Sequence, residues 1–156
     1  MKEAIIMAHQ AKDNGDYGIG AVIVKNGVIV VRVANSTKTR EDPTQHAELL
    51  AISQASKILE SRHLTECVLY TTHEPCPMCA AAAVWAKLEG IVWGARMEDM
   101  ADYANKNGNS HYQWRTIKLK AQEIIEKGPD QPWVIDDFMR DECKKLFHDT
   151  IIVRSL

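Results

Sequence analysis

The chain has 156 residues, of which 46% are hydrophobic and 26% are charged, with a formal net charge of −2. This composition is typical of a globular protein whose single core needs no disulfide scaffold. No apolar stretch approaches the roughly 20 residues of a membrane span, and residues 1–13 lack the features of a signal peptide, so we expect neither. The lack of a basic surplus disfavours, without excluding, a nucleic-acid partner. We therefore expect residues 1–156 to form one cytoplasmic domain without membrane association.

The first half of the chain predicts a helix, a hairpin and a second helix. Residues 2–12 place alanines on one helical face. The segments 19–25 and 28–34 are β-rich and are joined by Asn26-Gly27, a strong hairpin signal. A helix is expected over about 43–60, with Asp42 or Thr44 as its cap.

The middle of the chain predicts a buried strand–helix–strand unit. The strand 67–72 is apolar on both faces, and an alanine-rich helix follows from Pro77 and ends before Gly90. The next strand covers 91–95. Such an order implies a parallel crossover in a buried sheet.

The last third gives a weaker signal. Segment 96–114 is expected to be a substrate-shaping loop or short helix, and the fifth strand falls in 116–121 or 132–135. A terminal helix is predicted over 136–150, and its inward residues are Phe138, Cys143, Leu146 and Phe147. Together these elements predict an α/β fold, a three-layer α/β/α sandwich with a central mixed five-stranded sheet.

Three candidate metal ligands stand at the starts of two helices. Cys76 and Cys79 are three residues apart, so both sulfurs can reach one metal, and a helix N-terminus favours their thiolate forms. His46 offers a third ligand from the other helix. Three protein ligands leave the fourth position of a zinc ion open to water, which is typical of catalytic sites.

Glu48 follows the candidate ligand His46 by two residues. A carboxylate there can lie beside the metal-activated water instead of on the metal. It can then take a proton from the water and deliver it to a leaving group, as general base and then general acid.

These residues resemble the zinc-dependent cytidine-deaminase superfamily. Its signature is His-x-Glu followed by Pro-Cys-x-x-Cys, matched here by 46–48 and 75–79, and the resemblance covers roughly residues 1–95. It implies one Zn²⁺ per chain held by His46, Cys76 and Cys79, with Glu48 as proton shuttle. The implied reaction is hydrolytic deamination, in which zinc hydroxide attacks an amidine-like ring carbon and ammonia leaves.

Two other interpretations of the cysteine pair fit the sequence less well. A zinc ribbon would need a second Cys-x-x-Cys, which the sequence lacks, and a redox pair would not explain His46 or Glu48. An inactive relative that serves as a zinc-binding module stays an alternative; it predicts bound zinc without turnover.

The motif context is similar to the purine branch of the superfamily, which contains guanine deaminases and tRNA adenosine deaminases. The resemblance implies that Asn35 meets the base, with Ala47 and Pro75 also at the substrate. Trp85, in a "VWA" context, is expected to form an aromatic wall beside zinc, or alternatively to be a core residue. A free nucleobase or nucleoside, guanine-like, is favoured on these grounds.

One departure weakens the guanine assignment. An acidic pair is expected after the fourth strand, where this chain has lysine and asparagine, so either Asp102 substitutes or the substrate is not guanine. Alternative substrates are a tRNA adenosine, cytosine or another heterocycle. The family also implies a homodimer whose interface helps to build the pocket.

Several neighbouring residues have secondary roles in this interpretation. Glu74 is expected to orient the loop before the cysteines, and His73 to lie near the pocket rim. A lid over the ligand, or an aromatic cluster that packs the last helix, is expected from Tyr103, His111, Tyr112 and Trp114.

Overall fold

The computed structural model describes residues 1–107 and 116–152. One mixed sheet runs through it, in the strand order β2-β1-β3-β4-β5. The strands are β1 (Gly20–Lys25), β2 (Val28–Ala34), β3 (Cys67–His73), β4 (Gly90–Ala95) and β5 (Trp133–Ile135). β1 is antiparallel to β2 and to β3, whereas β3, β4 and β5 are parallel to one another.

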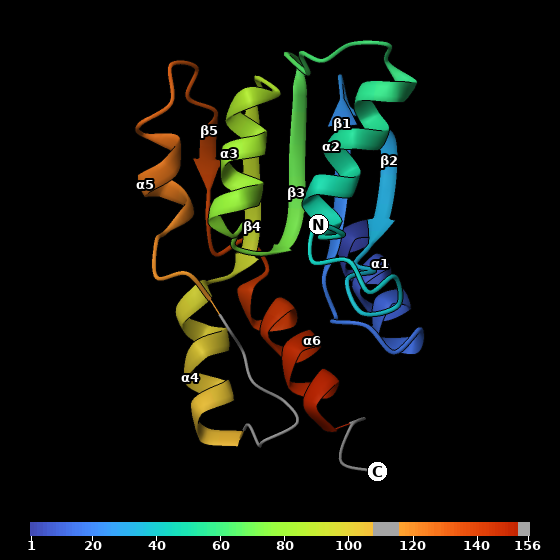
Figure 1. The fold of residues 1–156 in the computed structure, drawn as a ribbon, viewed down its shortest axis with the longest axis vertical. Coiled ribbons are helices and arrows are strands. Elements are labelled where there is room, and N and C mark those ends of the chain that lie inside the picture. Colours follow the sequence, from blue (N-terminus) through green and yellow to red (C-terminus); the bar gives the residue numbers. More distant parts are fainter. Residues whose placement is uncertain (108–115, 153–156) are drawn as a thin grey trace.

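Helices cover both faces of the sheet, as the three-layer prediction requires (Figure 1). They are α1 (Lys2–Asp13), α2 (Ala47–Ile58), α3 (Pro77–Trp85), α4 (Met97–Asn107), α5 (Ala121–Ile125) and α6 (Arg140–Ile152). Successive residues of β4 face opposite sides of the sheet. Trp93 packs in the core cluster with residues of α3 and α5, whereas a side chain at Gly94 would collide with Cys143 of α6 on the other side. The larger core lies between the sheet and α2, α3 and α5.

The structure corrects three expectations about element boundaries. Helix α2 begins at Ala47 instead of near residue 43, because Asp42 accepts hydrogen bonds from Thr44 and Gln45 in a preceding turn. His46, not Asp42 or Thr44, is the N-cap. Phe138 lies before α6 and is 45% exposed, although Cys143, Leu146 and Phe147 are buried as expected.

The segment after β4 forms the helix α4, which packs against α6 instead of standing free as a loop. Met100 is its buried residue, and Tyr103 packs edge-on against Phe147. Tyr103 thus belongs to an aromatic cluster with the last helix; the other residues of the expected lid, 111, 112 and 114, lie outside the described residues. Within residues 1–107 and 116–152, no helix combines the length and apolarity that crossing a membrane requires.

Candidate metal centre and active site

The three candidate ligands converge at one end of the sheet. His46 is the N-cap of α2 and Cys76 the N-cap of α3, both with extended backbone, and Cys79 lies one turn into α3. The His46 Nδ1 atom lies 3.6 Å from each sulfur, and the sulfurs are 3.5 Å apart. A tetrahedral zinc ion with bonds of about 2.3 Å to sulfur and 2.0–2.1 Å to nitrogen requires ligand separations close to these.

The chemistry of these donors fits a zinc ion. A hydrogen bond from Cys79 lowers the pKa of the Cys76 thiol to about 4, so one thiolate is already present at neutral pH. The same shared proton raises the pKa of Cys79, whose proton would leave when a metal binds. Pro77 occupies the first turn of α3, where its missing N–H group has no effect on the helix.

Glu48 lies within the first turn of α2 and is 3% exposed. Burial raises its pKa to about 7, and the nearby His46 opposes that shift. Its Oε2 atom is buried without a hydrogen-bond partner among the described residues. A carboxyl group with these properties is suited to exchange protons near neutral pH.

A cavity of about 390 Å³ opens at the metal centre. Its described walls come from the loop after α1, the ends of β2 and β3, the starts of α2 and α3, α4 and the segment before α5: Tyr17, Ile19, Asn35, Thr37, Pro43, His46, Glu48, His73, Glu74, Cys76, Pro77, Met78, Met100, Thr116 and Ile117. Neither lysine nor arginine occurs among these lining residues.

Asn35 is 4% exposed and lines this cavity, as expected of a residue that meets a ligand. Its amide nitrogen donates to Asp16 Oδ1 at 2.7 Å and to Thr37 Oγ1 at 3.0 Å. The other oxygen of Asp16 accepts hydrogen bonds from the backbone N–H groups of Lys38 and Thr39, both at 2.9 Å. Asp16 therefore joins Asn35 to the loop that follows β2.

Asp16 is 2% exposed and stays charged. Burial acts to raise its pKa, but hydrogen bonds from Thr39, Tyr17, Asn35 and Lys38 outweigh it, so the pKa lies below its usual value. No site role was expected for this aspartate from the sequence. Its partners are distant in sequence, and no local pattern marks them.

Glu74 orients the loop before the cysteines, in line with the expectation. One carboxylate oxygen accepts the backbone N–H of Met97 and the other that of Ala121, both at 3.0 Å. These bonds connect the end of β3 to the starts of α4 and α5. His73, expected at the pocket rim, is instead 2% exposed within the cavity wall.

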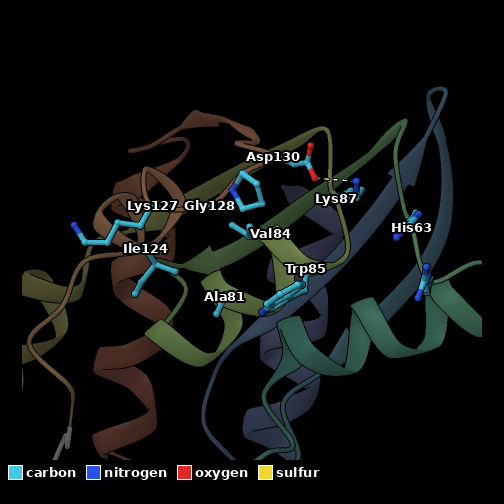
Figure 2. Close-up of a pocket in the computed structure, with 11 residues that line it drawn as sticks. His63, Ala81, Val84, Trp85, Lys87, Ile124, Lys127, Gly128 and Asp130 are labelled. Carbon is cyan, nitrogen blue, oxygen red and sulfur yellow. Dashed lines mark ion pairs between the residues drawn. The ribbon is translucent and has the colours of Figure 1, made fainter.

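Trp85 does not form the expected wall beside the metal. It ends α3, six residues after Cys79, and a helical rise of 1.5 Å per residue moves it roughly 9 Å along the axis from that ligand. Its side chain is 80% exposed, so it is not a core residue either. Figure 2 shows it near Ala81 in a separate groove of about 750 Å³, where Lys87 pairs with Asp130 at 2.9 Å.

The remaining expected substrate residues differ in position. Asp102 is exposed on α4 and does not line the cavity, so it is not placed to replace the missing acidic pair. Ala47 and Pro75 are buried. Neither of the two lines the cavity, but Ala47 lies between the lining residues His46 and Glu48, and Pro75 lies between Glu74 and Cys76.

Comparisons with known proteins agree with this geometry. The model of the family "Cytidine and deoxycytidylate deaminase zinc-binding region" matches residues 1–95. The chain is 42% identical to a guanine deaminase of Bacillus subtilis over 85% of its length and 90% of that protein. It is also 46% identical to a tRNA-specific adenosine deaminase of the same organism, over 92% of its length and 81% of that protein.

A solved structure from a study of tRNA:A34 deaminases, which edit A to I at the wobble position, has the same fold. The TM-score is 0.74 at 27% identity, and the match covers 94% of this chain and 96% of that one. The five-stranded mixed sheet predicted from the sequence is thus confirmed.

Proposed function

Since the chain belongs to the cytidine and deoxycytidylate deaminase zinc-binding family and is a zinc-dependent aminohydrolase, we propose that it deaminates a free purine base of the guanine type. The relatives divide between guanine and tRNA adenosine, so their identities alone do not select a substrate. The choice follows from the chemistry of the cavity.

The observation that carries the proposal is the cavity wall without lysine or arginine among its described residues. A protein that binds a nucleic-acid strand contacts its phosphates mainly through those two residue types. A free base carries no phosphate and is bound by a small cavity with a few polar groups. The volume of about 390 Å³ and the net charge of −2 agree with such a ligand.

We propose that His46 Nδ1, Cys76 Sγ and Cys79 Sγ hold the zinc ion, since they form the metal-capable cluster among the described residues. Bound zinc supplies a Lewis acid that lowers the pKa of a water molecule. The protein supplies two thiolates whose charge balances the ion.

Glu48 moves the protons in this proposal. Its unpartnered Oε2 accepts a proton from the attacking water and then donates it to the substrate, so that the ring carbon gains oxygen and loses ammonia. Burial keeps bulk water away from this carboxyl group, which therefore exchanges protons with the substrate side of the cavity.

Asn35, directly after the end of β2, binds the base through an amide that Asp16 and Thr37 hold in place. Ala47 contributes a backbone N–H group that, as the first of α2, has no acceptor within the helix. Pro75 contributes the carbonyl group of the residue before Cys76. These three contacts orient the amine-bearing carbon toward the metal.

The test is ammonia release by the zinc-loaded protein from guanine, adenine, cytosine, their nucleosides and a tRNA anticodon stem-loop. Glu48→Ala serves as the blank. Turnover of guanine is expected, and turnover of the stem-loop alone would overturn the free-base proposal in favour of tRNA editing. Zinc without turnover on the panel would favour a binding module.

We also propose that two copies associate through the outer face of α3. This helix carries no charged residue, and its face includes Met78, 38% exposed, and Trp85, 80% exposed. A helix that is apolar all round is ordinarily buried. Met78 also lines the metal cavity, so a second copy on this face would reach the cavity mouth.

Residues 1–156 are proposed to form one deaminase domain of the cytoplasm. One sheet joins residues 20–135, and the main core cluster draws on α2, α3 and α5. The described cysteines are free thiols, which suits a reducing compartment.

A further inference from the structure

His73 is a buried polar residue that the mechanism above does not use. It ends β3, three residues before Cys76, and only 2% of its surface is exposed. Its ring lines the same cavity as Asn35, His46 and Glu48. Burial of a histidine in that wall costs desolvation free energy that an apolar residue of similar size would not cost, which indicates a polar role for the ring.

The hydrogen bond of Nδ1 defines the tautomer of this ring. Thr72 Oγ1 lies 2.9 Å from His73 Nδ1 and also accepts the backbone N–H of Gly20 at 3.2 Å. Gly20 is a donor, so among the described residues Nδ1 is the one acceptor within reach of the single hydroxyl hydrogen of Thr72. Nδ1 is then the acceptor, and the ring proton resides on Nε2.

The ring is neutral at physiological pH. Burial lowers the pKa of His73 to about 3, although the negative charge of Asp99 opposes the shift. A neutral imidazole has one donor and one acceptor, and the acceptor is already used.

The donor Nε2 is buried and has no hydrogen-bond partner among the described residues. The ring also packs edge-on against Phe147, with 6.5 Å between ring centroids, but a phenylalanine side chain has no oxygen or nitrogen acceptor to offer. Buried donors of native proteins are nearly always satisfied. The described residues do not supply this partner, so we expect it from what occupies the cavity.

We infer that His73 is a substrate-binding residue whose Nε2–H group donates a hydrogen bond to an acceptor atom of the bound base, a carbonyl oxygen or an unprotonated ring nitrogen. The inference rests on the proposed function for the identity of the ligand as a base. Together with Asn35 it gives the cavity two polar contacts on the ring beyond the reacting carbon.

The test compares His73→Leu, which removes the donor at similar volume, with His73→Gln, which retains an N–H donor. His9→Leu, at an exposed position on α1, is the control for the substitution itself. For His73→Leu we expect kcat/KM on guanine to fall roughly tenfold or more, mainly through KM. Its melting temperature should change little, because removal of the unsatisfied Nε2–H donor offsets the loss of the Thr72 hydrogen bond to Nδ1. His73→Gln should recover part of the activity.

A structural role would produce the opposite pattern. If His73→Leu lowers the melting temperature together with kcat, or leaves KM at the wild-type value, the inference is wrong. Loss of activity with unchanged or increased stability cannot arise from a residue that only supports the fold.

A second measurement separates this inference from the proposed function. In ¹⁵N-labelled wild-type protein, the His73 ring should show the Nε2–H tautomer, and its proton should shift when guanine, adenine or cytosine is added. A shift without turnover would reject the deaminase substrate but support the contact. Absence of any shift, or the Nδ1–H tautomer, would overturn the contact even in an active enzyme.

Discussion

The carboxylate of Asp16 accepts a hydrogen bond of 2.7 Å from the side-chain amide of Asn35, and both groups are buried. Because a carboxylate only accepts hydrogen bonds, the amide nitrogen of Asn35, and not its oxygen, must face Asp16. One charged group thus determines which way the cavity-lining amide is turned. The same carboxylate fixes the backbone of Lys38 and Thr39.

Asp16→Asn replaces one carboxylate oxygen by an NH₂ group, which cannot accept hydrogen bonds from the N–H groups around it. Asn35 must then rotate its amide or lose its hydrogen bond to residue 16. We expect kcat/KM to fall roughly tenfold to hundredfold, whereas zinc content stays at the wild-type level. Steady-state kinetics and metal analysis of the purified variant measure both quantities.

Asp13→Asn is the matched control, since Asp13 is exposed three residues earlier. In the background of Asn35→Ala, the effect of Asp16→Asn on kcat/KM should shrink, because the two residues act through one contact. Full additivity of the two losses would contradict the positioning role of Asp16.

The metal centre could be predicted from sequence because its geometry is local. Cys76 and Cys79 are brought together by one turn of α3, and His46 and Glu48 by the start of α2. Only the meeting of the two helix starts depends on the fold, and the resemblance to the deaminase superfamily implied it.

The residues that the sequence analysis missed or misplaced depend on tertiary contacts. Asp16 contacts Thr39, 23 residues away, so no periodic pattern marks it. Trp85 was placed beside the metal from its motif context, although the six residues of helix after Cys79 already separate it from that ligand by roughly 9 Å along the axis. The helix α4 was expected only as an alternative to a loop, because it is rich in polar residues and buries only Met100.

Glu48→Gln should separate metal binding from chemistry. The amide cannot carry protons, so we expect kcat to fall by about 10²–10⁴-fold with zinc retained. The relevant measurements are ammonia release and zinc content on the same preparation. Wild-type turnover by this variant would show that another group shuttles the proton.

Substitution of a ligand should remove the metal instead. In Cys79→Ala or His46→Ala the cluster loses one of its three donors, so zinc should drop from about one ion per chain to near zero after dialysis. The melting temperature should fall with it, as it should for the wild type after chelation. Cys67→Ala, a buried thiol outside the cluster, is expected to keep its zinc; equal loss in both variants would contradict the ligand assignment.

Asp99 links α4 to α6 and should contribute to stability in a pH-dependent way. It accepts two hydrogen bonds from Arg140, at 2.7 and 2.8 Å, and this contact lowers its pKa from 3.8. A lowered pKa means that the stabilisation is complete above pH 3.8 and disappears as the pH falls through the lower folded value. Asp99→Asn should therefore cost about 1 kcal/mol at pH 7 and progressively less below pH 3.8 in urea unfolding. A difference that stays constant down to pH 2 would be inconsistent with this ion pair.

Trp85 tests the proposed association of two copies. Trp85→Glu places a charge on the otherwise uncharged face of α3, where a large aromatic residue would contribute most to an interface. We expect the wild type to sediment as a dimer and the variant to dissociate about a hundredfold more readily. Ile6→Glu, at a position of α1 that is 53% exposed, is the control and should leave the dimer intact. Because Met78 of the same face lines the cavity, dissociation should also raise KM. A wild-type protein that stays monomeric at micromolar concentration would contradict the proposed association, whereas a Trp85→Glu variant that stays dimeric would place the interface on another face.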